Sequence, residues 1–291
     1  MKNRTVIPEC WDEMTTRQFK YLLRKVFVMM NNTTITKDDV LRDFANYILG
    51  GNAWFRLFKN KSTDYLILVN GAAEILSWIF DIENDEVSLT FDTTKNILPR
   101  IGKLIGPKSA GSDLRFGEYR KACWMYNRYT VEHDMASLDG LVGILYRPPS
   151  TSIRPSTSLR PSTSLRYPDK FNGDYREPFN EYLIAKYAKR VKRIPEHIKW
   201  GIYLWFGYFC KYLMTGEFYI DGTEVSFAPL FQSGGDPDGK SDESLGMTSV
   251  LFSLAESRTF GNVDETDNAS LFKVMLKLLN DDITAKNLKK Q

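Results

Sequence analysis

The stretch that most constrains this chain runs over residues 198–214, IKWGIYLWFGYFCKYLM. Aromatic and aliphatic residues occupy nearly every position, so a helix drawn through it must be buried over most of its surface. Only eleven uncharged residues separate Lys199 from Lys211, whereas a membrane-spanning helix needs about 20 apolar ones. We therefore predict the central helix of a globular core, opened by Pro195 in its first turn, and no membrane span.

The composition is that of an ordinary soluble protein with a substantial core. Hydrophobic residues make up 43% of the 291 positions and charged residues 26%, which is typical of globular chains. A net charge of +3 does not by itself indicate nucleic acid. Cys10, Cys123 and Cys210 are widely separated, which favours buried thiols in a reducing compartment. The first residues contain no secretory signal, so we expect the protein to work in the host cytoplasm where it is made.

Apolar residues recur at helical spacing along most of the chain. A capping box at residues 15–18 predicts a helix over 16–30, and Thr36 caps the next helix, which Gly50-Gly51 ends. A third helix is predicted over 63–80 with Leu66 and Val69 facing inward, although Asn70-Gly71 is also typical of a hairpin turn. One short strand is predicted at 87–91. Further helices are predicted over 114–130, 135–146, 180–193, 245–257 and 269–281.

These elements predict a mostly α fold: a helical bundle with a small β-hairpin or loop insertion and a tethered C-terminal helical piece. An N-terminal helical part covers 1–148, and the central aromatic helices over 173–231 complete the same domain. A polar linker over 232–244 has the composition of a flexible segment. The C-terminal helical segment follows at 245–291.

An insert separates the two parts of the predicted main domain. Three tandem copies of one hexamer, PSTS[IL]R, begin at Pro149, Pro155 and Pro161, and we assign the insert to residues 149–172. Each copy has a single aliphatic residue, which is too little for the stacked core of a solenoid. A tract rich in Pro, Ser and Thr is normally an extended, exposed segment, so we interpret it as a surface loop.

Motifs that would indicate chemistry are incomplete in this sequence. His133 and His197 are the only histidines, and neither has a Cys or His neighbour at metal-ligand spacing. Gly106-Pro-Lys-Ser109 does not have the spacing of a phosphate-binding loop. Asp236-Pro-Asp-Gly239 does not have the remaining ligands of a calcium loop. We predict no catalytic residue, no metal and no cofactor, and hence a protein that is not an enzyme.

A basic stripe is the best candidate for contact with nucleic acid. Lys186, Lys189, Arg190 and Arg193 recur at three- and four-residue spacing on the predicted 180–193 helix, and such residues neutralise phosphates. Nearby acidic residues, among them Glu177 and Glu181, dilute this charge. A solvated helix face is therefore favoured over a nucleic-acid site.

Three segments resemble proteins encoded in the tail-gene region of phages and prophages of Bacteroides-type bacteria. The first runs from LRFGEY at 114–119 to LVGILYRP at 141–148. The second begins with GDYREPFN at 173–180 and continues through the aromatic helix. The third contains LFSLAE at 251–256, Phe260-Gly261 and 271–279, and is similar to the C-terminal part of tail assembly chaperones. The family has only a short variable loop where this chain has its hexamer repeats.

The resemblance implies a non-enzymatic tail assembly factor that binds other tail proteins, such as the tape-measure or tube protein. It implies no particular oligomeric state. Two alternatives stay open: a structural protein that remains in the virion, at the tail or connector, and a nucleic-acid-binding protein that uses the basic stripe. Such a chaperone needs an exposed apolar surface. The predicted partner-binding residues are Phe252, Phe260, Phe272 and Leu276.

Overall fold

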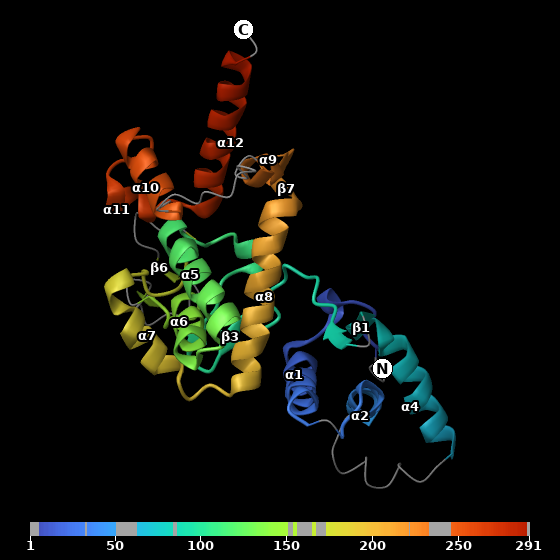
Figure 1. The fold of residues 1–291 in the computed structure, drawn as a ribbon. Helices are drawn as coiled ribbons and strands as arrows, with labels where there is room; N and C mark the ends of the chain where they lie inside the picture. The colour runs from blue at the N-terminus through green and yellow to red at the C-terminus, as the bar shows by residue number, and fades with distance from the viewer. Residues whose placement is uncertain are drawn as a thin grey trace. The chain divides into compact units, whose positions relative to one another are not determined.

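A computed structural model describes residues 6–32, 34–50, 63–83, 86–150, 154–155, 165–166, 173–220, 222–232 and 246–289. Its secondary structure is mostly α-helical, as predicted (Figure 1). Within these ranges the strands form four two-stranded antiparallel sheets. Most of the predicted insert over 149–172, and all of the predicted linker over 232–244 except residue 232, lie outside the described residues.

The chain divides into two compact units. Unit 1 comprises residues 1–97 and 195–205, and unit 2 comprises residues 98–194 and 206–291. These limits do not coincide with those of the predicted segments. They fall before Leu98 and inside the aromatic helix α8 (Glu196–Thr215), which contributes one half to each unit.

Among the described residues of unit 1, three helices that precede α8 pack together, and the first two start at the predicted capping signals. The helices are α1 (Thr16–Met30), α2 (Lys37–Gly50) and α4 (Thr63–Ile75), and α2 contacts both of the others. The Thr15 hydroxyl accepts a hydrogen bond from the Gln18 amide, and the Gln18 side chain accepts one from the Thr15 amide. Thr36 and Asp39 make the same reciprocal pair ahead of α2. Both helix starts therefore confirm the prediction.

The segment 63–80 differs from its prediction at its end and in its inward face. Helix α4 ends at Ile75, η2 (Leu76–Ile79) follows, and β1 (Phe80–Glu83) pairs with β2 (Glu86–Leu89). The side chain of Leu66 is 52% exposed, whereas Tyr65 and Ala72 are buried. The buried face is set by Tyr65, whose hydroxyl donates to Asn46 Oδ1 on α2 at 2.7 Å. The helix continues through Asn70-Gly71, so no hairpin turn forms there.

The side chain of Trp11 packs the irregular segment around it against the core of unit 1. Trp11, in η1 (Trp11–Glu13), contacts the rings of Phe19, Trp78 and Phe91 at centroid distances of 5.0–5.9 Å. Its indole N–H donates to the carbonyl of Thr90 at 2.6 Å. The buried indole of Trp11 thus combines apolar packing with one satisfied donor.

Helix α8 confirms the prediction of a buried aromatic helix. Its fully buried side chains include Ile202 and Trp205 in unit 1 and Phe206 and Phe209 in unit 2. A Cβ at Gly207 would lie 2.5 Å from the Tyr126 hydroxyl of α5, so glycine permits this close approach. In the described part of the chain, no helix combines the length and hydrophobicity needed to cross a membrane.

Three helices of unit 2 lie side by side: α5 (Phe116–Glu132), α6 (Met135–Leu145) and α7 (Ile184–Val191), the last preceded by η4 (Glu181–Leu183) (Figure 1). Asp134 caps α6 through the amides of Ala136 and Ser137. The segment before α5 contains β3 (Arg100–Ile101), β4 (Leu104–Ile105) and η3 (Ser109–Gly111). Ile105 and Arg147 exchange backbone hydrogen bonds, which joins this segment to the end of α6.

The segment that leads into the insert, residues 148–150, runs antiparallel beside residues 175–177, which follow it. Ser150 N donates to the Tyr175 carbonyl and Glu177 N to the Pro148 carbonyl, at 2.8 and 2.7 Å. Farther along, the short strands β5 (Arg154–Pro155) and β6 (Leu165–Arg166) pair. We call the pairing of residues 148–150 with 175–177 the neck of the insert.

After α8, the described part of unit 2 continues with two short strands and four helices. Phe272 of the last helix contacts the rings of Phe218 and Phe227. The predicted helices at 245–257 and 269–281 are confirmed, although the second continues to Leu288; α11 was not predicted. The elements are β7 (Glu217–Ile220), β8 (Thr223–Ser226), α9 (Ala228–Gln232), α10 (Met247–Glu256), α11 (Val263–Asp267) and α12 (Leu271–Leu288).

Candidate functional site

The best candidate for a partner-binding surface is an open groove between α10 and α11, which we call the α10–α11 groove. Its volume is about 530 Å³. Phe252 is 51% exposed and Val263 37% exposed, although both are large and apolar. The groove is lined by Phe252, Ala255, Glu256, Arg258, Gly261, Asn262 and Val263.

A tight turn between the two helices shapes the groove. Arg258 and Gly261 both adopt left-handed backbone conformations, with φ of 54° and 99°. Asn262 then caps α11: its side chain accepts from the Glu265 amide and Glu265 accepts from the Asn262 amide, both at 2.9 Å. A Cβ at Gly261 would overlap the Glu265 carboxylate. The turn therefore requires glycine at this position.

Contacts with α5 hold this turn in place from behind. Arg120 of α5 makes an ion pair with Asp267 of α11 at 2.8 Å. Residues 114–116 exchange backbone hydrogen bonds with residues 269–271, including Leu271 N to the Leu114 carbonyl at 3.0 Å. The groove is thus built on packed helices, a support that suits a preformed binding surface better than a free loop does.

The lining of the α10–α11 groove is suited to binding rather than to bond-breaking chemistry. Phe252, Ala255 and Val263 are apolar, while Glu256 and Arg258 add one charge of each sign. The lining has no nucleophile beside a base, the arrangement that covalent catalysis requires. An apolar side chain of a partner, flanked by polar groups, fits this chemistry.

The structure separates the four predicted partner-binding residues. Phe252 lines the groove, whereas Phe260 is half-buried in the turn and is not among the lining residues. Phe272 packs on Phe218 and Phe227 with centroids 5.2 and 6.2 Å away, so its ring contributes to the core of unit 2. Leu276, one turn later on α12, is also half-buried. Of the four residues, only Phe252 lines the α10–α11 groove.

The basic stripe lies on α7 and the turn that follows it. Lys186, Lys189, Arg190 and Arg193 are all exposed, as expected for a solvated helix face. Arg190 makes an ion pair with Glu177 at 2.6 Å and lies over the Tyr187 ring. Part of the positive charge is thus neutralised within the protein.

A buried charge cluster occupies the interior of unit 2, and sequence patterns did not reveal it. Arg147 and Arg176 are buried together with three carboxylates. Both guanidinium groups donate to Glu118 Oε1, at 2.9 and 2.6 Å. Its members are Asp113, Glu118, Arg147, Asp174 and Arg176.

The hydrogen bonds of this cluster are nearly complete. Arg176 donates to both oxygens of Asp174, at 2.8 and 3.1 Å, and to the Leu145 carbonyl at 2.9 Å. Arg147 Nε donates to the Glu177 carbonyl at 2.7 Å, and Arg147 Nη1 also donates to the Ile144 carbonyl. Glu118 is fully buried, and both of its carboxylate oxygens accept hydrogen bonds from arginine side chains.

The charges of the cluster respond to burial and to one another. Burial opposes the charge of Arg176, but Glu118, Asp174 and Asp113 outweigh it and raise the guanidinium pKa above its usual range. Burial also raises the pKa of the Asp113 carboxyl, against the attraction of Arg176. A buried network of this kind is costly to break and fixes the register of the segments it joins.

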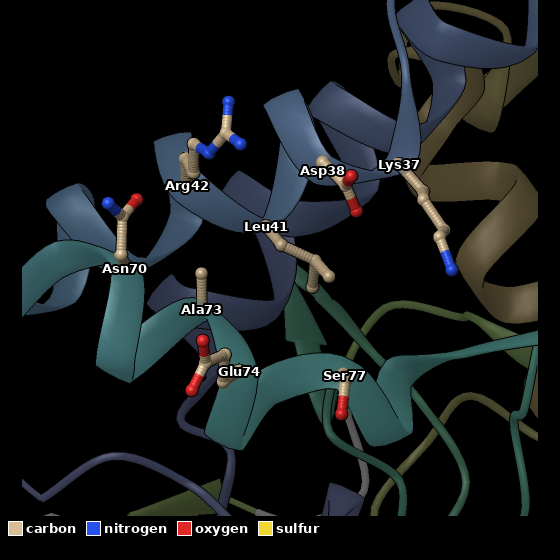
Figure 2. A pocket seen from close by; sticks show the side chains of 8 residues that line it. All are labelled: Lys37, Asp38, Leu41, Arg42, Asn70, Ala73, Glu74 and Ser77. Carbon is tan, nitrogen blue, oxygen red and sulfur yellow. The ribbon is translucent and has the colours of Figure 1, made fainter.

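A second groove, the α2–α4 groove, lies in unit 1 and has a polar lining (Figure 2). Its volume is about 410 Å³. Lys37, Asp38 and Arg42 project from α2, and Asn70 and Glu74 from α4. All of these charged side chains except Lys37 are well exposed. Charges of both signs in open solvent do not define a ligand, so we rank this groove below the α10–α11 groove.

The two histidines do not form a reactive site. His133 ends α5 in a left-handed conformation, with φ of 51°. His197 packs near Phe27 in unit 1, and burial, together with Arg24, lowers its pKa. Across the described ranges, no three His, Cys, Asp or Glu side chains gather as they would around a metal ion. The residues Asp236–Gly239 of the incomplete calcium motif lie outside those ranges.

Sequence reasoning missed most of the groove lining and all of the buried charge cluster. The Asn262-Val-Asp-Glu265 capping box, preceded by Gly261, was the available signal for α11 and hence for the groove. Arg147 and Arg176 lie inside the segments that carry the family resemblance, but their pairing with Glu118 depends on tertiary contact. Comparisons with protein-family models, curated proteins and solved structures found no match to this chain.

Proposed function

We propose that this chain is a non-enzymatic phage tail assembly factor that binds other tail proteins. The observation that carries the proposal is the α10–α11 groove, where Phe252 and Val263 are exposed over a preformed turn. The resemblance of three sequence segments to tail-region proteins supplies the biological setting. The partner we propose is the tape-measure or the tube protein.

The chemistry of the groove favours a short apolar segment as its occupant. Phe252 on α10 presents an apolar ring to solvent, and burying such a side chain contributes about 1.5–3 kcal/mol. Glu256 and Arg258 at the rim add orientation more than affinity, because exposed charges are screened by salt. This combination suits a reversible complex during assembly.

A pair of matched variants tests the proposed binding surface. Phe252→Asp places a charge in the groove, and we expect at least a tenfold loss of affinity for the tail partner, measured by titration calorimetry. Val131→Asp is the control, because Val131 on α5 is 80% exposed and lies outside the groove lining. Equal affinity of the two variants would exclude the groove as the binding surface.

A second experiment separates an assembly factor from a structural virion protein. Quantitative mass spectrometry would compare purified particles of the encoding phage with the infected-cell lysate. An assembly factor is abundant in the lysate and absent from particles. A fixed copy number in particles would instead make the chain a structural protein of the tail or connector.

Nucleic-acid binding is a second candidate because all four residues of the basic stripe are exposed. If the stripe binds DNA, affinity must fall steeply with salt, since each neutralised phosphate releases counterions. The variant Lys186→Ala/Lys189→Ala/Arg190→Ala/Arg193→Ala should then abolish binding in a gel-shift assay. Retention of binding by this variant would exclude the stripe as the DNA site.

A further inference from the structure

Two cysteine thiols meet inside unit 2. Cys123 on α5 and Cys210 on the second half of α8 have their Sγ atoms 3.9 Å apart, and both are free thiols. They are 87 positions apart in the sequence. Tyr119 lies one turn before Cys123 on α5, and both thiols contribute to raising the pKa of its hydroxyl.

The surroundings of this thiol pair are apolar. The rings of Phe206 and Phe209 lie beside Tyr119, each with a centroid distance of 6.2 Å. Burial raises the pKa of the Cys210 thiol well above its ordinary value, and burial likewise raises the pKa of Tyr119. Both groups are therefore neutral at physiological pH. The pair has too few ligands for a structural zinc site, which takes four.

We propose that Cys123 and Cys210 form a redox-active pair that closes into a disulfide joining α5 to α8. A disulfide bond is about 2.05 Å long, so the sulfur atoms must approach by roughly 2 Å, a movement within reach of rotation about the Cα–Cβ bonds. The rest of the unit need not rearrange, because the two helices are already packed. This inference does not depend on the proposed function.

The oxidation balances with a second disulfide as the oxidant. A thiolate of the pair attacks oxidised glutathione, which forms a mixed disulfide and releases one glutathione thiol. The other cysteine then attacks the mixed disulfide and releases the second glutathione. The protein loses two protons and two electrons, and the glutathione disulfide is reduced to two thiols. Because burial raises the pKa of the Cys210 thiol, attack by this sulfur is slow and accelerates as the pH rises.

The test uses the full chain with Cys10→Ser, which removes the exposed third thiol. The protein is equilibrated in glutathione redox buffers, once folded and once in urea, then quenched with acid. We expect the folded chain to lose two hydrogen atoms by intact mass, and a non-reducing peptide map to link Cys123 with Cys210. The equilibrium constant for closing the Cys123–Cys210 disulfide with oxidised glutathione gives the effective concentration of one thiol at the other. This effective concentration should be at least about tenfold higher in the folded chain than in urea.

A matched variant, Cys10→Ser/Cys210→Ser, keeps only Cys123 and should acquire glutathione without forming an internal link. Two results would overturn the proposal. One is an effective concentration in the folded chain equal to or below that in urea. The other is a folded chain that accumulates only glutathione adducts, with Cys123 and Cys210 unlinked.

Discussion

The buried charge cluster of unit 2 and the α2–α4 groove of unit 1 contain the same kinds of side chain in opposite surroundings. Arg176 and Glu118 are inside the protein and make several hydrogen bonds each, whereas Arg42 and Glu74 are exposed. A buried charge without its partner is strongly destabilising, whereas an exposed ion pair contributes about 0–1 kcal/mol. Surroundings, not residue type, decide what a charge does for the fold.

The largest expected effect comes from breaking the buried cluster. Arg176→Met leaves the Glu118 and Asp174 carboxylates without a main partner, so we expect a loss of about 3–5 kcal/mol in the free energy of unfolding. Urea denaturation followed by circular dichroism measures it. Adding Glu118→Leu to this variant should restore part of the loss, because it removes one of the three carboxylates that Arg147 alone would then have to balance. If Arg176→Met alone is as stable as the wild type, the cluster does not stabilise unit 2.

The two aromatic residues Phe272 and Phe252 extend the contrast to apolar side chains. Phe272→Ala removes a ring packed on Phe218 and Phe227, and we expect it to cost about 2–3 kcal/mol. Phe252→Ala, in the α10–α11 groove, should change stability by less than about 1 kcal/mol. Thermal unfolding of both variants measures the difference. Equal losses would mean that Phe252 belongs to the core as well.

The comparison of buried with exposed charges can also be made through the pH dependence of stability, with Asp113 of the buried cluster and Asp134 at the start of α6. Burial raises the pKa of Asp113 above its ordinary value of 3.8 in the folded state. Its contribution to stability is therefore full below that value and is lost as the pH rises through the folded-state pKa. Hydrogen bonds from the Ala136 amide and the Ser137 side chain lower the pKa of Asp134, so its contribution has the opposite sign and is lost as the pH falls.

Asp113→Asn and Asp134→Asn should accordingly shift the stability profile in opposite directions. On acidification, the wild type should gain stability relative to Asp113→Asn and lose stability relative to Asp134→Asn. Urea denaturation between about pH 3 and 7 measures both. Parallel profiles for the two variants would contradict the assigned environments of these carboxylates.

The smallest effect is expected in the α2–α4 groove. Arg42→Ala and Glu74→Ala should each change the free energy of unfolding by no more than about 0.5 kcal/mol, because both side chains are exposed. The same urea assay applies, with Arg176→Met as the reference for a large effect. A loss above about 2 kcal/mol would place a structural role in this groove.

Local signals in the sequence were sufficient for much of the helical fold. The pairs Thr15 with Gln18 and Thr36 with Asp39 act over three residues, so the helix starts could be read directly. The length and aromatic content of α8 likewise indicated burial. Leu66 was misplaced because α4 is apolar on several sides, and periodicity then cannot determine which side faces α2.

The candidate sites depend on tertiary contacts, which the spacing of residues along the sequence does not reveal. Glu118, Arg147 and Arg176 come from α5, the end of α6 and the segment after the insert, and only the folded chain brings them together. Phe252 and Phe272 both follow helical patterns, yet one is exposed and the other is half-buried against Phe218 and Phe227. The thiols of Cys123 and Cys210 meet for the same tertiary reason.

The neck of the insert has a genetic consequence. Arg147 and Arg176 stand on either side of the hexamer repeats, and both are anchored on Glu118, while backbone pairing joins residues 148–150 to 175–177. Tandem copies of a short coding unit gain and lose whole copies when a DNA polymerase slips during replication. Because the neck fixes both ends, loop-closure entropy changes only slowly with the number of residues between them. A change in the number of hexamer copies should therefore cost the fold little free energy.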